Sequence, residues 1–145
     1  MRHLSRFAIV AVCSASALTG CQDSTAPTVV STYVLRALGS TPVPAPEGAS
    51  PDYLLVADTM RFRSDGIVTQ TITRQMPDAA GATTRTHGTS TMHYTIDGSV
   101  VHFSVTCPPG ADCIRTPMGT LIDSKLDMFY DPGLPPIYHF ERISP

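Results

Sequence analysis

The chain lacks the short motifs that mark common catalytic sites. It has no Gly-x-Ser-x-Gly elbow, no His-Glu-x-x-His zinc motif and no phosphate-binding loop. Scattered Ser, His and Asp residues occur in any chain of this length and do not define a catalytic triad. We therefore expect a protein that is not an enzyme and that requires no cofactor.

Positive charge is also scarce. The chain has 10 Lys and Arg residues against 12 Asp and Glu residues, so its formal net charge is −2. Surfaces that bind nucleic acid neutralise phosphates with many Lys and Arg side chains. We therefore expect no nucleic-acid partner.

The apolar run near the N-terminus is too short to cross a bilayer. Residues 7–18 would form a helix about 18 Å long, against a hydrocarbon core of about 30 Å. Arg2, His3 and Arg6 precede this run, and small residues follow it. A basic head, a short apolar run and a small-residue end predict a signal peptide over residues 1–20.

The four residues after the apolar run, Leu18-Thr19-Gly20-Cys21, resemble the lipobox of bacterial lipoproteins. The resemblance implies cleavage before Cys21, a diacylglycerol on its sulfur and an acylated amine, with chains such as palmitate. Several acyl chains give a firm membrane anchor. We expect an envelope lipoprotein, and Gln22 resembles the outer-membrane sorting pattern of diderm bacteria. The alternative is an ordinary signal peptide with a chance cysteine.

Loss of residues 1–20 leaves one domain-sized chain. It removes Arg2 and Arg6, so 8 basic residues remain against 12 acidic ones, a formal net charge of −4. Residues 21–31 are polar and aperiodic, which predicts a tether, and residues 32–145 are long enough for a single folded domain.

Two further cysteines remain in the mature chain. Cys107 and Cys113 flank Pro108-Pro109-Gly110, which favours a tight turn. In an oxidising compartment this spacing predicts a disulfide. Half of a metal site is the alternative, but there is no second cysteine pair to complete one.

Strand patterns dominate the rest of the chain. Short segments rich in Val, Ile, Thr, Tyr and Phe alternate with Gly, Pro, Asp and Ser clusters. Eight strands are predicted, at 32–38, 54–63, 67–74, 89–96, 99–105, 117–122, 125–130 and 136–143. Apolar and polar residues alternate along them, so each strand buries one face. Such a sheet closes into a barrel or, as the alternative, forms a β-sandwich.

The predicted connections alternate in length. Tight hairpin turns are predicted at 64–66, 97–98 and 123–124. The long connections are 39–53, 75–88, 106–116 and 131–135. In an up-and-down meander, all tight turns lie at one end and all long connections at the other. We expect a cup with a closed base and an irregular rim.

Four segments resemble the lipocalin-like domains of small bacterial lipoproteins, in the calycin barrel group. They are STYVL at 31–35, Phe62 with the DG turn at 65–66, YTIDG at 94–98 and YHFER at 138–142. The resemblance implies an eight-stranded antiparallel up-and-down barrel whose first and last strands pair. It also implies that an arginine of the last strand closes the base. Arg142 is then expected to lie on the ring of Tyr33 as a cation–π contact.

Two histidines are weak candidates for a metal site. A turn at Asp97-Gly98 would place His93 directly opposite His102, with Cβ atoms about 5 Å apart. A transition metal needs at least a third ligand. His87, in a predicted loop, is the candidate for it, whereas His139 and Glu141 are expected to lie across the barrel. An exposed polar pair is the favoured interpretation, so we expect no metal.

Asp58 interrupts an inward apolar series formed by Leu54, Val56, Met60 and Phe62. A buried carboxylate is costly unless it is paired. We favour a β-bulge that turns Asp58 outward or an internal partner for it. The alternative is a wet cavity in which Asp58 binds the polar end of a ligand.

The function predicted from this barrel is the binding of a small apolar ligand. Barrels of about eight strands either fill with their own side chains or hold one small ligand. If the barrel is hollow, the candidate ligand-binding residues are Asp58, Phe62, Tyr94 and Phe103. If it is filled, we expect a non-catalytic structural lipoprotein whose long loops contact an envelope protein.

Overall fold

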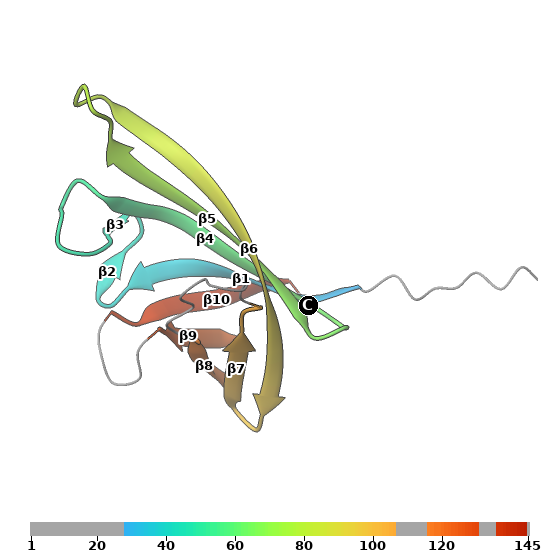
Figure 1. Cartoon of the computed structure of the whole chain (residues 1–145). Helices are drawn as coiled ribbons and strands as arrows, with labels where there is room; N and C mark the ends of the chain where they lie inside the picture. The colour runs from blue at the N-terminus through green and yellow to red at the C-terminus, as the bar shows by residue number, and fades with distance from the viewer. Residues whose placement is uncertain (1–27, 107–115, 131–135, 145) are drawn as a thin grey trace, which may run out of the picture.

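The computed structural model describes residues 28–106, 116–130 and 136–144 (Figure 1). These residues form strands and turns without helices, and so none of them forms a membrane-spanning apolar helix. The strands are β1 (Val29–Leu38), β2 (Thr41–Pro42), β3 (Ala45–Pro46), β4 (Leu54–Arg63), β5 (Ile67–Pro77), β6 (Thr83–Asp97), β7 (Val100–Ser104), β8 (Met118–Ile122), β9 (Lys125–Phe129) and β10 (Tyr138–Ser144).

Eight of these strands form a closed antiparallel barrel. The sheet runs from β1 through β10, β9, β8, β7, β6 and β5 to β4, and β4 pairs back onto β1. Tyr33 pairs with Arg142 on β10 and with Met60 on β4, so the first strand joins the two ends of the sheet. The predicted up-and-down barrel is therefore confirmed. The two short strands β2 and β3 lie outside this ring.

The tight turns lie where residues that tolerate a positive φ occur. Gly66, Gly98 and Asp123 have φ values of 76°, 59° and 56°. Glycine carries no Cβ penalty in this region, and aspartate is among the few other residues that enter it readily. These three residues lie in the turns of the hairpins β4–β5, β6–β7 and β8–β9. The turns at 64–66 and 123–124 are as predicted, whereas the turn predicted at 97–98 lies one residue later, at Gly98 and Ser99.

The connection predicted over residues 75–88 is wrong. β5 continues to Pro77 and β6 begins at Thr83, so only a short turn separates them. The carboxylate of Asp78 accepts from the N–H groups of Ala80 and Ala82, at 2.8 and 2.9 Å, and holds this turn. The extension was missed because β6 is exposed on both faces over Thr83–Thr91. A strand with no buried face has no apolar alternation.

The barrel wall has unequal heights. The strands β4, β5 and β6 have 10, 11 and 15 residues, whereas β7, β8 and β9 have 5 each. At about 3.3 Å per residue, the tall side rises well above the short side. Figure 1 shows the β5–β6 hairpin projecting past the other strands. We call the end with the long connections the mouth and the end with the tight turns the base.

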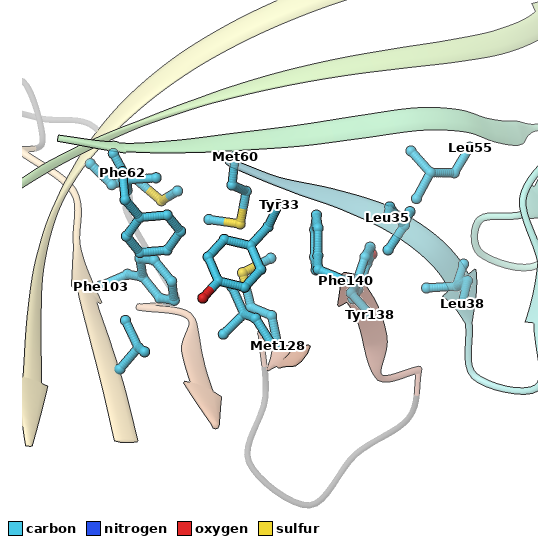
Figure 2. Close-up of a cluster of buried hydrophobic side chains, with 14 of the residues drawn as sticks. Tyr33, Leu35, Leu38, Leu55, Met60, Phe62, Phe103, Met128, Tyr138 and Phe140 are labelled. Atoms are coloured by element: carbon cyan, nitrogen blue, oxygen red, sulfur yellow. The ribbon is translucent and has the colours of Figure 1, made fainter. Parts of the chain in front are cut away.

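The base half of the barrel is filled with side chains (Figure 2). Phe62 lies at its centre, with ring centroids 5.4 Å from Tyr33, 4.8 Å from Tyr94 and 6.1 Å from Phe103. Most of these contacts are edge-on or tilted, which is the favourable geometry for aromatic rings. Met60, Met128 and Phe140 continue the packing toward the mouth, where Leu35, Leu38 and Leu55 are also buried.

Candidate functional site

Asp58 points into the barrel. Its side chain is 1% exposed, between the buried residues Leu55 and Met60 of β4. A β-bulge is present, but it lies between Leu55 and Ala57, upstream of Asp58. The bulge makes Leu55, rather than Leu54 and Val56, the inward residue of this segment, so the predicted inward series is wrong there. Asp58 therefore faces the barrel interior. It has an internal partner, which was the second of the two expectations for this residue.

Gln70 is that partner. Its Nε2 donates to Asp58 Oδ2 at 2.7 Å, and Gln70 is itself buried. The same Nε2 lies 3.4 Å from the hydroxyl of Tyr130, and Ser90 Oγ lies 3.5 Å from Gln70 Oε1. Asp58 Oδ1 is buried and has no hydrogen-bond partner among the described residues. One acceptor atom inside the barrel is therefore left unsatisfied, which is costly.

Burial raises the pKa of Asp58 to about 7. The hydrogen bond from Gln70, the positive charge of Arg74 and a weaker backbone interaction with Thr59 lower this pKa, and the negative charge of Glu47 adds to the rise. The carboxyl group therefore changes charge near neutral pH. A buried acid whose pKa is raised in this way is a candidate functional group.

An ion pair lies on the mouth side of Asp58 and Gln70. Arg74 on β5 binds Glu47 through Nε and Nη2, at 2.5 and 2.9 Å. The hydroxyl of Tyr138 donates to Glu47 Oε1 at 3.3 Å, and the ring of Tyr138 meets that of Tyr130 edge-on at 5.3 Å. Glu47 raises the pKa of Arg74 through these hydrogen bonds, and burial raises the pKa of Tyr138. Such a two-pronged pair fixes the guanidinium in place.

These groups form one polar cluster inside the barrel, which we call the mouth cluster. Its members come from β4, β5, the segment after β3, the residue that follows β9 and the start of β10. They are Glu47, Asp58, Gln70, Arg74, Tyr130 and Tyr138. Ala45 of β3 is fully buried, so the segment after β2 covers part of the mouth.

The β5–β6 side of the mouth is open. Ile72 of β5 packs on the core and pairs with Gly88 of β6, so both face inward. Gly88 and its inward neighbours Thr86 and Ser90 are exposed, because the short strands opposite do not reach this height. A Cβ added at Gly88 would meet nothing within 4 Å. Ile72 and Gly88 therefore border free space beside the buried carboxyl of Asp58.

The sequence predicted Asp58, Phe62, Tyr94 and Phe103 as one ligand-binding set. The structure brings the three aromatic residues together in the base half, where their rings pack on one another. Asp58 lies four residues from Phe62 along β4, about 13 Å away in an extended strand. The hydroxyl of Tyr94 donates to the carbonyl of Arg63 at 2.7 Å. The aromatic trio thus fills the base, and Asp58 belongs to a different group.

The register confirms the predicted pairing of Tyr33 with Arg142. Among the described residues, however, the ring of Tyr33 contacts Phe62, and Arg142 makes no cation–π contact with it. Tyr33 is buried whereas Arg142 is exposed, in a shallow hollow with Ser124, Ile143 and Ser144.

The predicted facing pair of histidines is wrong. The β6–β7 turn uses Gly98 and Ser99, so Asp97 pairs with Val100. This moves the register by two residues, and His93 faces Ser104 while Thr95 faces His102. His87 bonds through Nδ1 to the hydroxyl of Thr73 at 3.0 Å. The part of the chain that the structure describes contains no group of three metal-ligating side chains.

On the outer wall, Glu141 of the last strand forms an ion pair and His139 bonds to a carboxylate. His139 Nδ1 lies 2.7 Å from Asp127 Oδ1, and Arg36 Nε lies 2.9 Å from Glu141 Oε2. Both pairs are substantially exposed and border an outer groove of about 450 Å³. Exposed pairs of this kind contribute little to stability.

The lipidation and disulfide predictions concern Cys21, Cys107 and Cys113. All three residues, like the predicted signal peptide, lie outside the described residues.

The sequence signal for the mouth cluster was present but incomplete. Gln70 and Arg74 occupy inward positions of β5, just as Asp58 does on β4. Polar residues at inward positions of neighbouring strands indicate an internal polar group. Glu47 carries no such signal, because it lies in a Pro-rich connection whose path depends on tertiary contacts.

The comparisons with known proteins found no match. No family model matches the chain, and neither a curated protein nor a solved structure matches it.

Proposed function

We propose that the chain is a lipoprotein of the bacterial cell envelope, anchored through Cys21, whose lipocalin-like barrel binds a small molecule without catalysing a reaction. The ligand has an apolar body and a hydrogen-bond donor. The observation that carries this proposal is that Asp58 Oδ1, buried beside the open side of the mouth, has no hydrogen-bond partner in the described ranges of the chain.

The two parts of the ligand meet different residues. Its donor group binds Asp58 Oδ1, which has no hydrogen-bond partner among the described residues. Its apolar body lies against Ile72, in the space beside Gly88. Ligand sites are mostly apolar with a few placed polar groups, and this arrangement fits that description. Above pH 7 the carboxylate favours a cationic donor, because the buried charge is then compensated.

The substitution Gly88→Leu tests the ligand site. The leucine side chain enters the space beside Ile72, and the backbone at Gly88 is in an ordinary conformation, so the strand should form normally. Full-length chain is purified from membranes of its own host and analysed by native mass spectrometry. We expect a co-purified small molecule in the wild type and a loss of at least about tenfold in its occupancy in the variant. Thr89→Leu, on the outer face of the same strand, is the matched control and should retain the molecule.

A second candidate function follows from the filled base half. Phe62, Phe103 and Phe140 leave that half without an opening among the described residues. This packing favours a structural or protein-interaction lipoprotein. If the purified wild-type chain carries no bound molecule, the ligand proposal is wrong. The structural or protein-interaction role then remains.

The anchor is tested by Cys21→Ala. Without the sulfur that carries the diacylglycerol, the mature chain has no acyl chains to bury, and binding to membranes should be lost. Fractionation of cells is expected to move the protein from the membrane pellet to the soluble fraction. Cys13→Ala, within the apolar run of the signal, is the matched control and should stay in the pellet. If the Cys21 variant also stays in the pellet, the anchor proposal is wrong.

A further inference from the structure

Over most of its length, one edge of β6 has no neighbouring strand among the residues that the structure describes. The strand comprises Thr83–Asp97, but β7 pairs only with residues His93–Asp97. The preceding residues, Thr83–Met92, pair with β5 on one side, and the described residues provide no strand on the other (Figure 1). This edge is distinct from the proposed ligand site beside the mouth cluster, which lies on the inner face of the sheet.

The hydrogen bonds identify which backbone groups face this edge. Tyr94 N–H donates to the carbonyl of Gly66, on the β5 side, at 2.8 Å. In an antiparallel strand, alternate residues direct their N–H and C=O groups to the same side. The even-numbered residues of β6 therefore bond toward β5. The N–H and C=O groups of Arg85, His87, Thr89 and Thr91 point to the uncovered edge.

This edge lacks the devices that keep strands from pairing with other chains. Proteins protect exposed edges with charged side chains, especially Lys, with Pro, with bulges or with very short strands, and Arg85 is the one Lys or Arg side chain on this edge. Residues 83–92 include no Lys and no Pro, and the β5–β6 register runs without a shift from Ile67–His93 to Pro77–Thr83. Half of these residues are threonines, which favour extended backbone. The segment is therefore ready to accept another strand.

The basic side chains along this edge favour an acidic partner. Arg85 and His87 project to the outer face, and no acidic residue occurs before Asp97 in β6. Arg85 forms no ion pair within the described part of the chain, where its Nε meets Gln75 Oε1 at 3.4 Å. Opposite charges on directly facing residues of two strands attract. A partner with acidic side chains at alternate positions would meet both basic residues.

We propose that the edge of β6 over Thr83–Met92 binds an extended, acidic segment of another protein by strand addition. Main-chain hydrogen bonds to Arg85, His87, Thr89 and Thr91 supply affinity, and the basic side chains supply preference. The lipid-anchored barrel would in this way dock an envelope protein while its mouth stays open.

Amide hydrogen exchange with a model peptide tests the proposal. The probe is a peptide of alternating Thr and Asp, matched in length to Thr83–Met92, added to full-length chain. We expect the amides of residues 85, 87, 89 and 91 to exchange fast alone and at least about tenfold more slowly with peptide. The even-numbered amides, already bonded to β5, should not change. A Thr-Lys peptide should bind more weakly, and a peptide with N-methylated backbone should give no protection.

Two variants separate strand addition from simple charge attraction. Thr89→Pro removes one edge N–H without breaking a bond to β5, and proline is tolerated at such edge positions. It should abolish protection by the peptide, whereas Thr89→Val, which keeps the N–H, should not. Peptide protection that survives Thr89→Pro, or no protection in the wild type, overturns the proposal. Protection without peptide that grows with protein concentration overturns it in favour of a second copy of this chain.

Discussion

Replacing Phe62 by alanine is expected to lower the free energy of unfolding by about 4 kcal/mol. The ring is 3% exposed and contacts the rings of Tyr33, Tyr94 and Phe103, so its removal leaves a cavity that stiff barrel walls cannot close. Urea denaturation of the wild type and the variant measures the difference.

The matched control is Ile122→Ala, because Ile122 is a large apolar residue that is 60% exposed. It should change the free energy of unfolding by less than about 0.5 kcal/mol. A loss below about 1 kcal/mol in the Phe62 variant would mean that the base half is loosely packed. The base could then hold a ligand, and the division between filled base and open mouth would be wrong.

Asp58→Asn is expected to change how stability depends on pH. Burial raises the pKa of Asp58 to about 7 in the folded chain, from 3.8 in the unfolded chain. Between these values the folded state binds more protons, so the wild type loses stability as pH rises from about 4 to 7. The loss amounts to at most about 4 kcal/mol. It is complete above pH 7, where Asp58 is ionised in both states.

Asparagine removes this dependence because its amide does not ionise and still accepts from Gln70. At pH 8 the variant should therefore be more stable than the wild type, and its stability should be nearly flat between pH 4 and 7. Thermal or urea unfolding across this range measures the difference. Asp123→Asn, in an exposed turn, is the control and should keep the wild-type slope. A variant less stable than the wild type at pH 8 would contradict the proposed cost of the buried charge.

Strands with one buried face could be predicted from the sequence. The bounds of β4, Leu54–Arg63, match the prediction, and the turns at Gly66 and Asp123 follow from residues that accept a positive φ. Alternation fixes such strands because a slip of one residue would expose their apolar side chains. The projecting part of β6 has no such constraint and was missed.

The register of β6 and β7 shows a second limit. The turn could use Asp97-Gly98 or Gly98-Ser99, since Gly98 supplies the positive φ in both. Local turn chemistry does not distinguish these two, and each gives a different partner for His102. The pairing is decided by the packing of Val101, which pairs with Ile96, and Phe103, which pairs with Tyr94.

The candidate site shows a third limit. Asp58 was recognised from its place in an apolar series, but Gln70 and Tyr130 come from strands far away in the sequence. The bulge near Val56 also changed which residues of β4 face inward. Contacts across the barrel depend on the final register of several strands. The sequence could therefore identify the unusual acid but not the partners that surround it.

A direct titration of the Asp58 carboxyl group tests whether the mouth holds a buried, incompletely paired acid. Carbon NMR of full-length chain labelled at aspartate carboxyl groups, assigned with the Asp58→Asn variant, follows this group from pH 3 to 9. The account predicts a midpoint near pH 7. A midpoint near 4, the value of an aspartate in water, would place the carboxyl group in solvent and contradict the proposed ligand site.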